Sequence, residues 1–122
     1  SGACLAGAKE AFTRVGLFYE HIFMYMEQID LLYRAKRYGY TSFFCSESAF
    51  IHTGAASSGS RKTPVVNIYR GILYFYRKHR SIIEQWVVRG FLRLKAYSAI
   101  GVGRALGRRD LVAIYEEALH MV

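Results

Sequence analysis

Apolar residues recur every three or four positions along most of the chain, which is the spacing of one face of an α-helix. A short helix is predicted from Ala8 to Val15, and Gly16 supplies its C-terminal stop. A clearer helix is predicted from about Met26 to Tyr38, and Gly39 ends it. The first third of the chain is therefore expected to be largely helical.

Three further helices are predicted in the second half of the chain. Pro64 suits the first turn of a helix that runs to about Arg80. Ser81 is expected to cap a long helix reaching about Ala105, because Glu84 follows at the capping-box position. Asp110 begins the last predicted helix. The long helix has an apolar arc made of Ile83, Val87, Gly90, Phe91, Leu94 and Ser98.

The segment between these helical regions has a different pattern. The runs Tyr40 to Cys45 and Ala49 to His52 are rich in β-formers and flank the polar turn Ser46-Glu47-Ser48, so two strands are predicted. Gly54 to Thr63 is small and polar, as in a mobile surface loop. The predicted fold is therefore mainly α-helical with two or three short β-strands.

Composition limits the size and the partners of the protein. With 122 residues, of which 52% are hydrophobic, the chain can form one modest domain or a domain fragment. Its net charge of +8 favours anionic partners, which could be nucleotide phosphates, nucleic acid or lipid headgroups. Cys4 and Cys45 form no metal or disulfide pattern, so a reducing cytoplasm is expected.

No targeting or membrane-spanning segment is predicted. The first residues lack a basic segment followed by an apolar run, and the absence of an initiator Met suggests a processed or truncated product. The most apolar segment, Ser81 to Gly107, is interrupted by charged and polar side chains that a bilayer core would exclude.

Two carboxylates stand out near the start of the second predicted helix. Glu27 and Asp30 are three residues apart, so they project on nearly the same face, near the positive end of the helix dipole. An ionised carboxylate at such a place could take a proton from a reacting hydroxyl. On spacing alone, an ordinary ion pair between Asp30 and Arg34 is the stronger interpretation, with Glu27 complementing the dipole.

A longer pattern surrounds these carboxylates. Residues 16–40, GLFYEHIFMYMEQIDLLYRAKRYGY, resemble the family 2 glycosyltransferase signature G-x-F-D-E-x-F-F-x-Y-x-E-D-x-D-L-x-x-R-x-x-x-x-G-Y. Ala49 to Gly54 is similar to the strand leading into the family's H-x-G segment. Arg70 with Tyr74 to His79 is similar to the R…Y-F-x-R-K-H helix of bacterial rhamnosyltransferase-like members. The resemblance covers roughly Gly2 to Arg80.

The resemblance implies an α/β parent enzyme of the GT-A type. Residues 1–63 would be the C-terminal part of the GT-A domain, and residues 64–122 a helical extension. The parent would move a sugar from a nucleotide-sugar donor to a saccharide or lipid-linked acceptor, with inversion, in cell-surface polysaccharide synthesis. Divalent Mg or Mn would be held by a D-x-D motif that this sequence lacks. The chain alone is therefore expected to be inactive.

The resemblance also implies roles for particular residues. The base of the family usually occupies the second position of the E-D pair, where this chain has Gln28, so Glu27 is predicted as the base and Asp30 as a positioning residue. His52 corresponds to a metal or diphosphate ligand, although a lone histidine is more often structural. Arg61 and Lys62 could cover the leaving diphosphate, or be incidental bases of a solvated linker.

Other classes of protein remain open. A nucleic-acid partner is not expected, because the bases are scattered and no recognition motif is present. A basic membrane-surface or protein-interaction module is the alternative, because Arg89, Arg93 and Lys95 flank the apolar arc. A homo-oligomer is also predicted, with Phe43, Phe50, Phe91 and Leu94 among its contacts or cores. The expected location is the cytoplasm, with the inner face of the membrane as an alternative.

Overall fold

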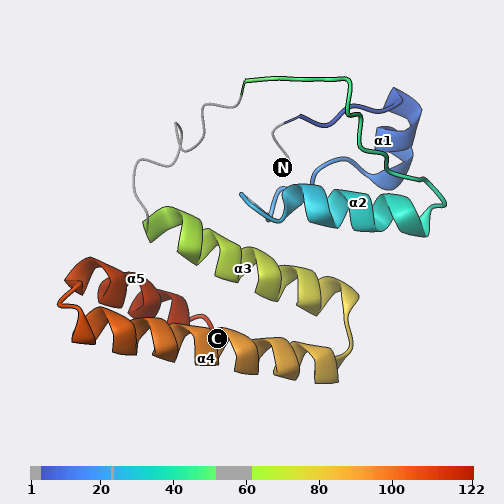
Figure 1. The fold of residues 1–122 in the computed structure, drawn as a ribbon. Coiled ribbons are helices and arrows are strands. Elements are labelled where there is room, and N and C mark those ends of the chain that lie inside the picture. The colour runs from blue at the N-terminus through green and yellow to red at the C-terminus, as the bar shows by residue number, and fades with distance from the viewer. Residues whose placement is uncertain (1–3, 23, 52–61) are drawn as a thin grey trace.

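The protein is a set of five α-helices in the part of the chain that the structure describes (Figure 1). This structure is a computed structural model, which describes residues 4–22, 24–51 and 62–122. The helices are α1 (Lys9–Val15), α2 (Glu27–Arg37), α3 (Lys62–His79), α4 (Ile82–Ala105) and α5 (Arg109–Leu119). In Figure 1, α1 lies beside α2, and α3 runs between α2 and the antiparallel pair of α4 and α5.

The ends of the first helices follow the glycine positions in the sequence. Gly16, directly after α1, has a φ of 93°, and its backbone N–H donates to the carbonyls of Phe12 and Thr13. Gly39, two residues after α2, has a φ of 84°. Both backbone angles lie in the left-handed region that residues with a Cβ disfavour. The helices predicted from Ala8 to Val15 and from about Met26 to Tyr38 are confirmed.

Helix α4 begins at the predicted capping box. The hydroxyl of Ser81 accepts from the backbone N–H of Glu84 at 3.4 Å, and the Glu84 carboxylate accepts from the Ser81 N–H at 2.9 Å. These bonds satisfy donors that the first turn of a helix leaves without partners. The helix ends at Ala105, as predicted.

The hydrophobic core lies where α3, α4 and α5 meet. Its buried members are Tyr69, Leu92, Ala96, Ala118 and Val122. The Tyr69 hydroxyl donates to the Leu92 carbonyl at 3.0 Å, which satisfies a polar group inside the core. Burial, together with the nearby Tyr115, raises the pKa of Tyr69 to about 12. This tyrosine is therefore a neutral packing residue at physiological pH.

The predicted strands are wrong for the residues that the structure describes. Tyr40 to Cys45 and Ala49 to Ile51 belong to no helix or strand. Phe43 and Phe44 are 88% and 92% exposed. A β-rich run becomes a strand only when a neighbouring strand completes its hydrogen bonds, and no strand lies in the described ranges. The predicted loop at Gly54 to Thr63 lies outside the description up to residue 61, whereas Lys62 and Thr63 belong to α3.

The apolar arc predicted for the long helix faces away from the core. The buried positions of α4 are Leu92, Ala96, Ile100 and Gly103, which lie on the opposite side from Phe91 and Leu94. A Cβ added at Gly103 would come within 2.9 Å of the Val112 side chain, so α4 and α5 approach closely there. Among the described helices, none is both long and apolar enough to cross a bilayer.

Candidate active site between helices α2 and α3

The carboxylate of Asp30 is the centre of a buried charged cluster. Its side chain is 0% exposed. Oδ1 accepts from Lys78 Nζ at 3.0 Å and lies 2.6 Å from His79 Nε2, both from α3. Oδ2 accepts from Arg34 Nε at 2.8 Å and from Lys78 Nζ at 3.2 Å. Three basic side chains from two helices therefore converge on one acid.

The cluster holds Asp30 in its ionised form. Burial alone would raise the pKa of this carboxyl, but the hydrogen bonds from His79, Lys78 and Arg34 outweigh burial and lower the pKa below its ordinary value of 3.8. An acid with a lowered pKa and fully engaged oxygens is a weak proton acceptor. Lys78 and Arg34 carry two fixed positive charges against this single negative charge, so the cluster is electropositive.

Arg34 also binds the end of helix α1. Its Nη2 donates to the Leu17 carbonyl at 2.5 Å, and its Nη1 donates to the Val15 carbonyl. The Val15 carbonyl belongs to the last turn of α1, where a helix leaves its carbonyls without internal partners. Leu17 has a φ of 55°, which is uncommon for a residue with a Cβ. The planar guanidinium thus joins α1 and the following turn to α2.

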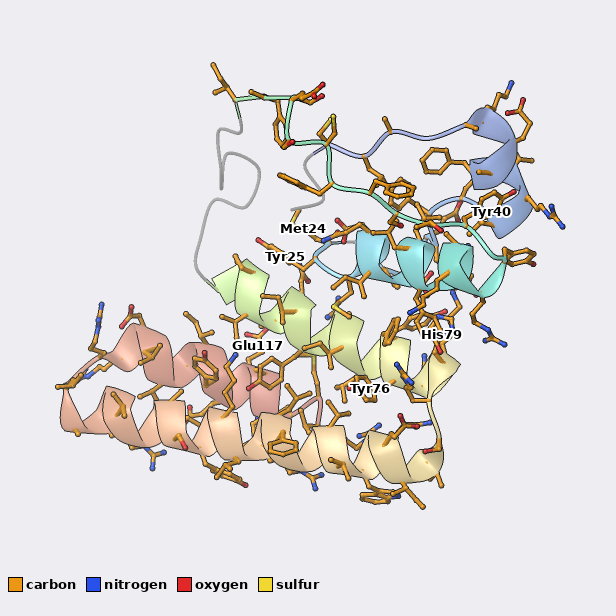
Figure 2. All side chains as sticks on the ribbon, turned by 45° about the vertical axis from the view of Figure 1, so that its right-hand side comes forward. Met24, Tyr25, Tyr40, Tyr76, His79 and Glu117 are labelled. Carbon is orange, nitrogen blue, oxygen red and sulfur yellow. The ribbon has the colours of Figure 1, made fainter. Side chains whose placement is uncertain are left out.

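Aromatic rings enclose the cluster. His79, labelled in Figure 2 near the C-terminal end of α3, has its ring centroid 4.7 Å from that of Tyr33 and 4.9 Å from that of Phe75. Lys78 Nζ lies 3.8 Å from the centroid of the Tyr19 ring, a cation–π contact. Burial, together with a hydrogen bond to Tyr19, raises the pKa of Tyr74 to about 12. These rings limit the access of water to the ion pairs, which strengthens them.

Glu27 lies one turn before Asp30, at the first position of α2. Its Oε2 is buried and accepts no hydrogen bond from the residues that the structure describes. Tyr25, two residues earlier and labelled in Figure 2, has a φ of 83°. Strained backbone of this kind is concentrated at functional sites. Burying a carboxylate oxygen without a hydrogen-bond partner destabilises the fold. Packing alone therefore does not account for a glutamate at this position.

Packing against α3 holds the start of α2 in place. A Cβ built on Gly71 would lie 2.7 Å from Met26 Cγ and 2.9 Å from Met26 Cβ. These distances are shorter than real Cβ contacts, so only glycine fits at this position without a shift. The start of α2 is thus seated on the middle of α3, while the Asp30 cluster joins the two helices nearer the end of α3.

The structure describes some of the predicted site residues and leaves others outside its description. Glu27 and Asp30 lie together at the start of α2, and the ion pair between Asp30 and Arg34 is present. His52 and Arg61 lie outside the described residues. Lys62 is the first residue of α3, and its side chain is outside the description. In the part described, no three metal-ligating side chains gather, and the expected Mg or Mn stays a prediction.

Lys78 and His79 were not predicted from the sequence as partners of Asp30. Their positions 48 and 49 residues after Asp30 leave no local spacing that could link them to it. A signal was present in the R-K-H run that the family resemblance includes. Two adjacent bases at the C-terminal end of a helix otherwise indicate only a favourable interaction with the helix dipole.

Comparison with known proteins gives a distant similarity to part of a glycosyltransferase. No protein-family model matches the chain, and neither does a solved structure. Two curated proteins from two strains of Mycobacterium tuberculosis do match, each described as an N-acetylglucosaminyl-diphospho-decaprenol L-rhamnosyltransferase. Each is 28% identical over 121 residues, which are 95% of this chain and 39% of the relative. The chain therefore spans about two fifths of the length of these relatives.

Proposed function

We propose that this chain forms the acceptor side of an inverting glycosyltransferase, which moves a sugar from a nucleotide-sugar donor to an acceptor hydroxyl. The distant similarity to part of a rhamnosyltransferase supports the class of reaction. The observation that carries the proposal is the contrast between two acids one helical turn apart. Asp30 is fully engaged by three basic side chains, whereas Oε2 of Glu27 is buried without a hydrogen-bond partner in the described part.

This contrast supports different roles for the two acids. Glu27 would take the proton of the acceptor hydroxyl as the hydroxyl oxygen bonds to the anomeric carbon of the donor sugar. The bond from that carbon to the nucleoside diphosphate breaks in the same step, and the diphosphate leaves with the bonding electrons. Asp30 would act as a positioning residue, because it fixes the first turns of α2 on α3 through Lys78 and His79.

The proposal extends to the acceptor. The names of the two relatives include a diphospho-decaprenol and an L-rhamnosyl group, so a lipid-linked diphosphate acceptor and a rhamnosyl donor are the substrates we assign. The electropositive surroundings of Asp30 support an acceptor that carries phosphate. Arg77 and Arg80 add two further cations at this end of α3, stacked on the rings of Tyr74 and Tyr33.

The donor-binding part of the enzyme is not assigned to the described residues. The first 63 residues would belong to the transferase domain and the remaining residues to a helical extension. The expected Mg or Mn stays a prediction, as do the roles of His52, Arg61 and Lys62 toward the diphosphate. We therefore expect no transfer from the 122-residue chain alone.

The test is Glu27→Gln in the complete polypeptide that carries this chain with its donor-binding part. The rate of rhamnosyl transfer to a polyprenyl-diphosphate acceptor should fall about 100-fold or more, because the amide cannot take the proton. The thermal midpoint of the variant should stay near that of the parent protein. Glu10→Gln, which removes an exposed carboxylate of α1 outside the signature, is the matched control and should leave the rate unchanged.

Asp30→Asn separates the two roles. This variant should lose stability along with activity, since it removes the centre of the ion-pair cluster. If Glu27→Gln keeps a normal rate while a folded Asp30→Asn protein has none, the base is Asp30. If neither substitution changes the rate, the proposed function of this site is wrong.

A further inference from the structure

Helix α4 exposes a continuous apolar surface on the side that faces away from α3 and α5. This surface, called here the outer face of α4, is formed by Ile83, Trp86, Val87, Phe91, Leu94 and Tyr97. Each of these side chains is between 53% and 72% exposed. Scattered apolar residues are normal on a protein surface, but six large ones on one face of a single helix indicate a contact site.

The sequence of α4 is apolar on two opposite sides. Leu92, Ala96 and Ile100 face the core, while the outer face lies roughly opposite at 100° per residue. A helix that is apolar all round is normally covered on all sides. Among the described residues, only one side of α4 is covered, and a Cβ built on Gly90 or Gly101 meets no atom within 4 Å. Figure 1 shows α3 and α5 on the same side of α4.

The charge around the outer face is predominantly positive. Between residues 80 and 109 the sequence has seven arginines and lysines and a single acid, Glu84. At 100° per residue, Lys95 lies about 110° to one side of the centre of the outer face, and Arg104 lies about 70° to the other side. Arg104 also forms an exposed ion pair with Glu116 of α5 at 3.1 Å. Arg89 and Arg93 donate to the Val122 carbonyl at 3.2 Å and 2.6 Å. An apolar face with a basic border is therefore built into one helix.

We infer that the outer face of α4 binds the surface of an anionic lipid membrane, with the helix parallel to the bilayer plane. Its apolar side chains would enter the boundary between headgroups and acyl chains, where Trp86 and Tyr97 are favoured residue types. Lys95 is long enough to extend its charge to the lipid phosphates. Arg104 would exchange its exposed ion pair with Glu116 for a lipid phosphate. This binding is separate from the transfer reaction, and the two can fail independently.

A second copy of the chain is the other candidate for this surface. Two outer faces in contact would bring two strongly basic borders together, and like charges across an interface oppose association. An anionic lipid surface instead attracts each of these cations. The sign of the charge therefore favours the membrane as the occupant of this face.

Trp86 provides a direct measurement, because it is the single tryptophan of the chain and lies on the outer face. Vesicles of phosphatidylcholine and phosphatidylglycerol in about a two-to-one ratio should shift its emission to the blue and carry the protein in flotation. Pure phosphatidylcholine vesicles should bind at least about tenfold less protein, and high salt should reduce binding to the anionic vesicles. The double variant Lys95→Gln with Arg104→Gln should also bind less to the anionic vesicles.

Variants on and off the face make the test specific. Phe91→Gln with Leu94→Gln should lower vesicle binding at least about tenfold, because the apolar area that enters the lipid is lost. Phe43→Gln with Phe44→Gln removes similarly exposed apolar side chains elsewhere and should leave binding unchanged. Circular dichroism checks that each variant keeps its helices.

Three outcomes would overturn the inference. The first is equal binding to neutral and anionic vesicles, and the second is equal loss of binding in both double variants. The third is a dimer in light scattering that Phe91→Gln with Leu94→Gln dissociates, with no response of Trp86 to vesicles. That result would assign the outer face of α4 to a second copy.

Discussion

His79 Nε2 lies 2.6 Å from Asp30 Oδ1, which joins α3 to α2 across 49 positions of sequence. An ionised carboxylate can only accept, so Nε2 of this histidine carries the hydrogen. The bond fixes one end of the junction between the two helices, and Met26 against Gly71 fixes the other. The start of α2, with Glu27, is held between these two points.

Asp30→Asn should lower the free energy of unfolding by about 2–4 kcal/mol, because the change leaves Arg34 and Lys78 without their shared counter-ion. Chemical denaturation followed by circular dichroism measures the loss. Glu116→Gln breaks the exposed ion pair with Arg104 and is the control, with an expected change within about 0.5 kcal/mol. Equal effects of the two substitutions would show that the Asp30 cluster does not stabilise the fold.

Stability should also fall at acidic pH through the same carboxyl. The pKa of Asp30 is lower in the folded protein than its ordinary value of 3.8, so the unfolded chain takes up the proton first as the pH falls. The contribution of Asp30 is therefore complete above about pH 4 and is lost as the pH falls toward the lowered pKa. Denaturation curves of the parent protein and Asp30→Asn should converge below this pH. A constant difference between them down to pH 2 would contradict the assignment.

Arg34→Lys should lower the free energy of unfolding by about 1–2 kcal/mol, although the substitution keeps the positive charge. The guanidinium binds Asp30 and the carbonyls of Val15 and Leu17 at once, and a single ammonium group cannot reach all three. Arg37→Lys, on the exposed end of the same helix, is the matched control and should be nearly neutral. Chemical denaturation of the two variants gives the free energies of unfolding to be compared. If neither change lowers the free energy of unfolding, the forked shape of the Arg34 guanidinium does not contribute to stability.

Gly71→Ala and Gly90→Ala should have opposite effects. The Cβ of alanine at residue 71 would lie 2.7 Å from Met26 Cγ and 2.9 Å from Met26 Cβ, so the start of α2 must shift. This shift should lower the free energy of unfolding by about 1–3 kcal/mol. Alanine at residue 90 meets nothing within 4 Å and should stabilise α4 by about 0.5–1 kcal/mol. Thermal melts of the two variants test the seating of α2 on α3, and stabilisation by both would argue against it.

Helix boundaries could be predicted because the chain marks them locally. Gly16 and Gly39 take up left-handed backbone angles that other residues avoid, and Ser81 with Glu84 satisfies its own helix end. These signals act over three or four residues, so they need no knowledge of the tertiary structure. The ion pair between Asp30 and Arg34 could also be predicted locally, since the two residues are four apart on one helix.

Features that depend on distant parts of the chain could not be predicted in this way. The strand propensity of Tyr40 to Cys45 gives a strand only beside a partner strand. For α4, two opposite sides have apolar residues, so periodicity does not tell which side faces the core. The approach of Lys78 and His79 to Asp30 depends on how α3 crosses α2, which no local pattern encodes.

The close approach of α4 and α5 has a consequence for the order of folding. Among the five described helices, these two make the most extensive contact of any pair, and only residues 106–108 connect them. Gly103, where the two helices touch, is close in sequence to its partner Val112. Short loops close at little entropic cost, so this pair should form early, whereas the cluster at Asp30 must wait for distant residues to meet. In pulse-labelled refolding, amide hydrogens of α4 and α5 should gain protection before those of α2.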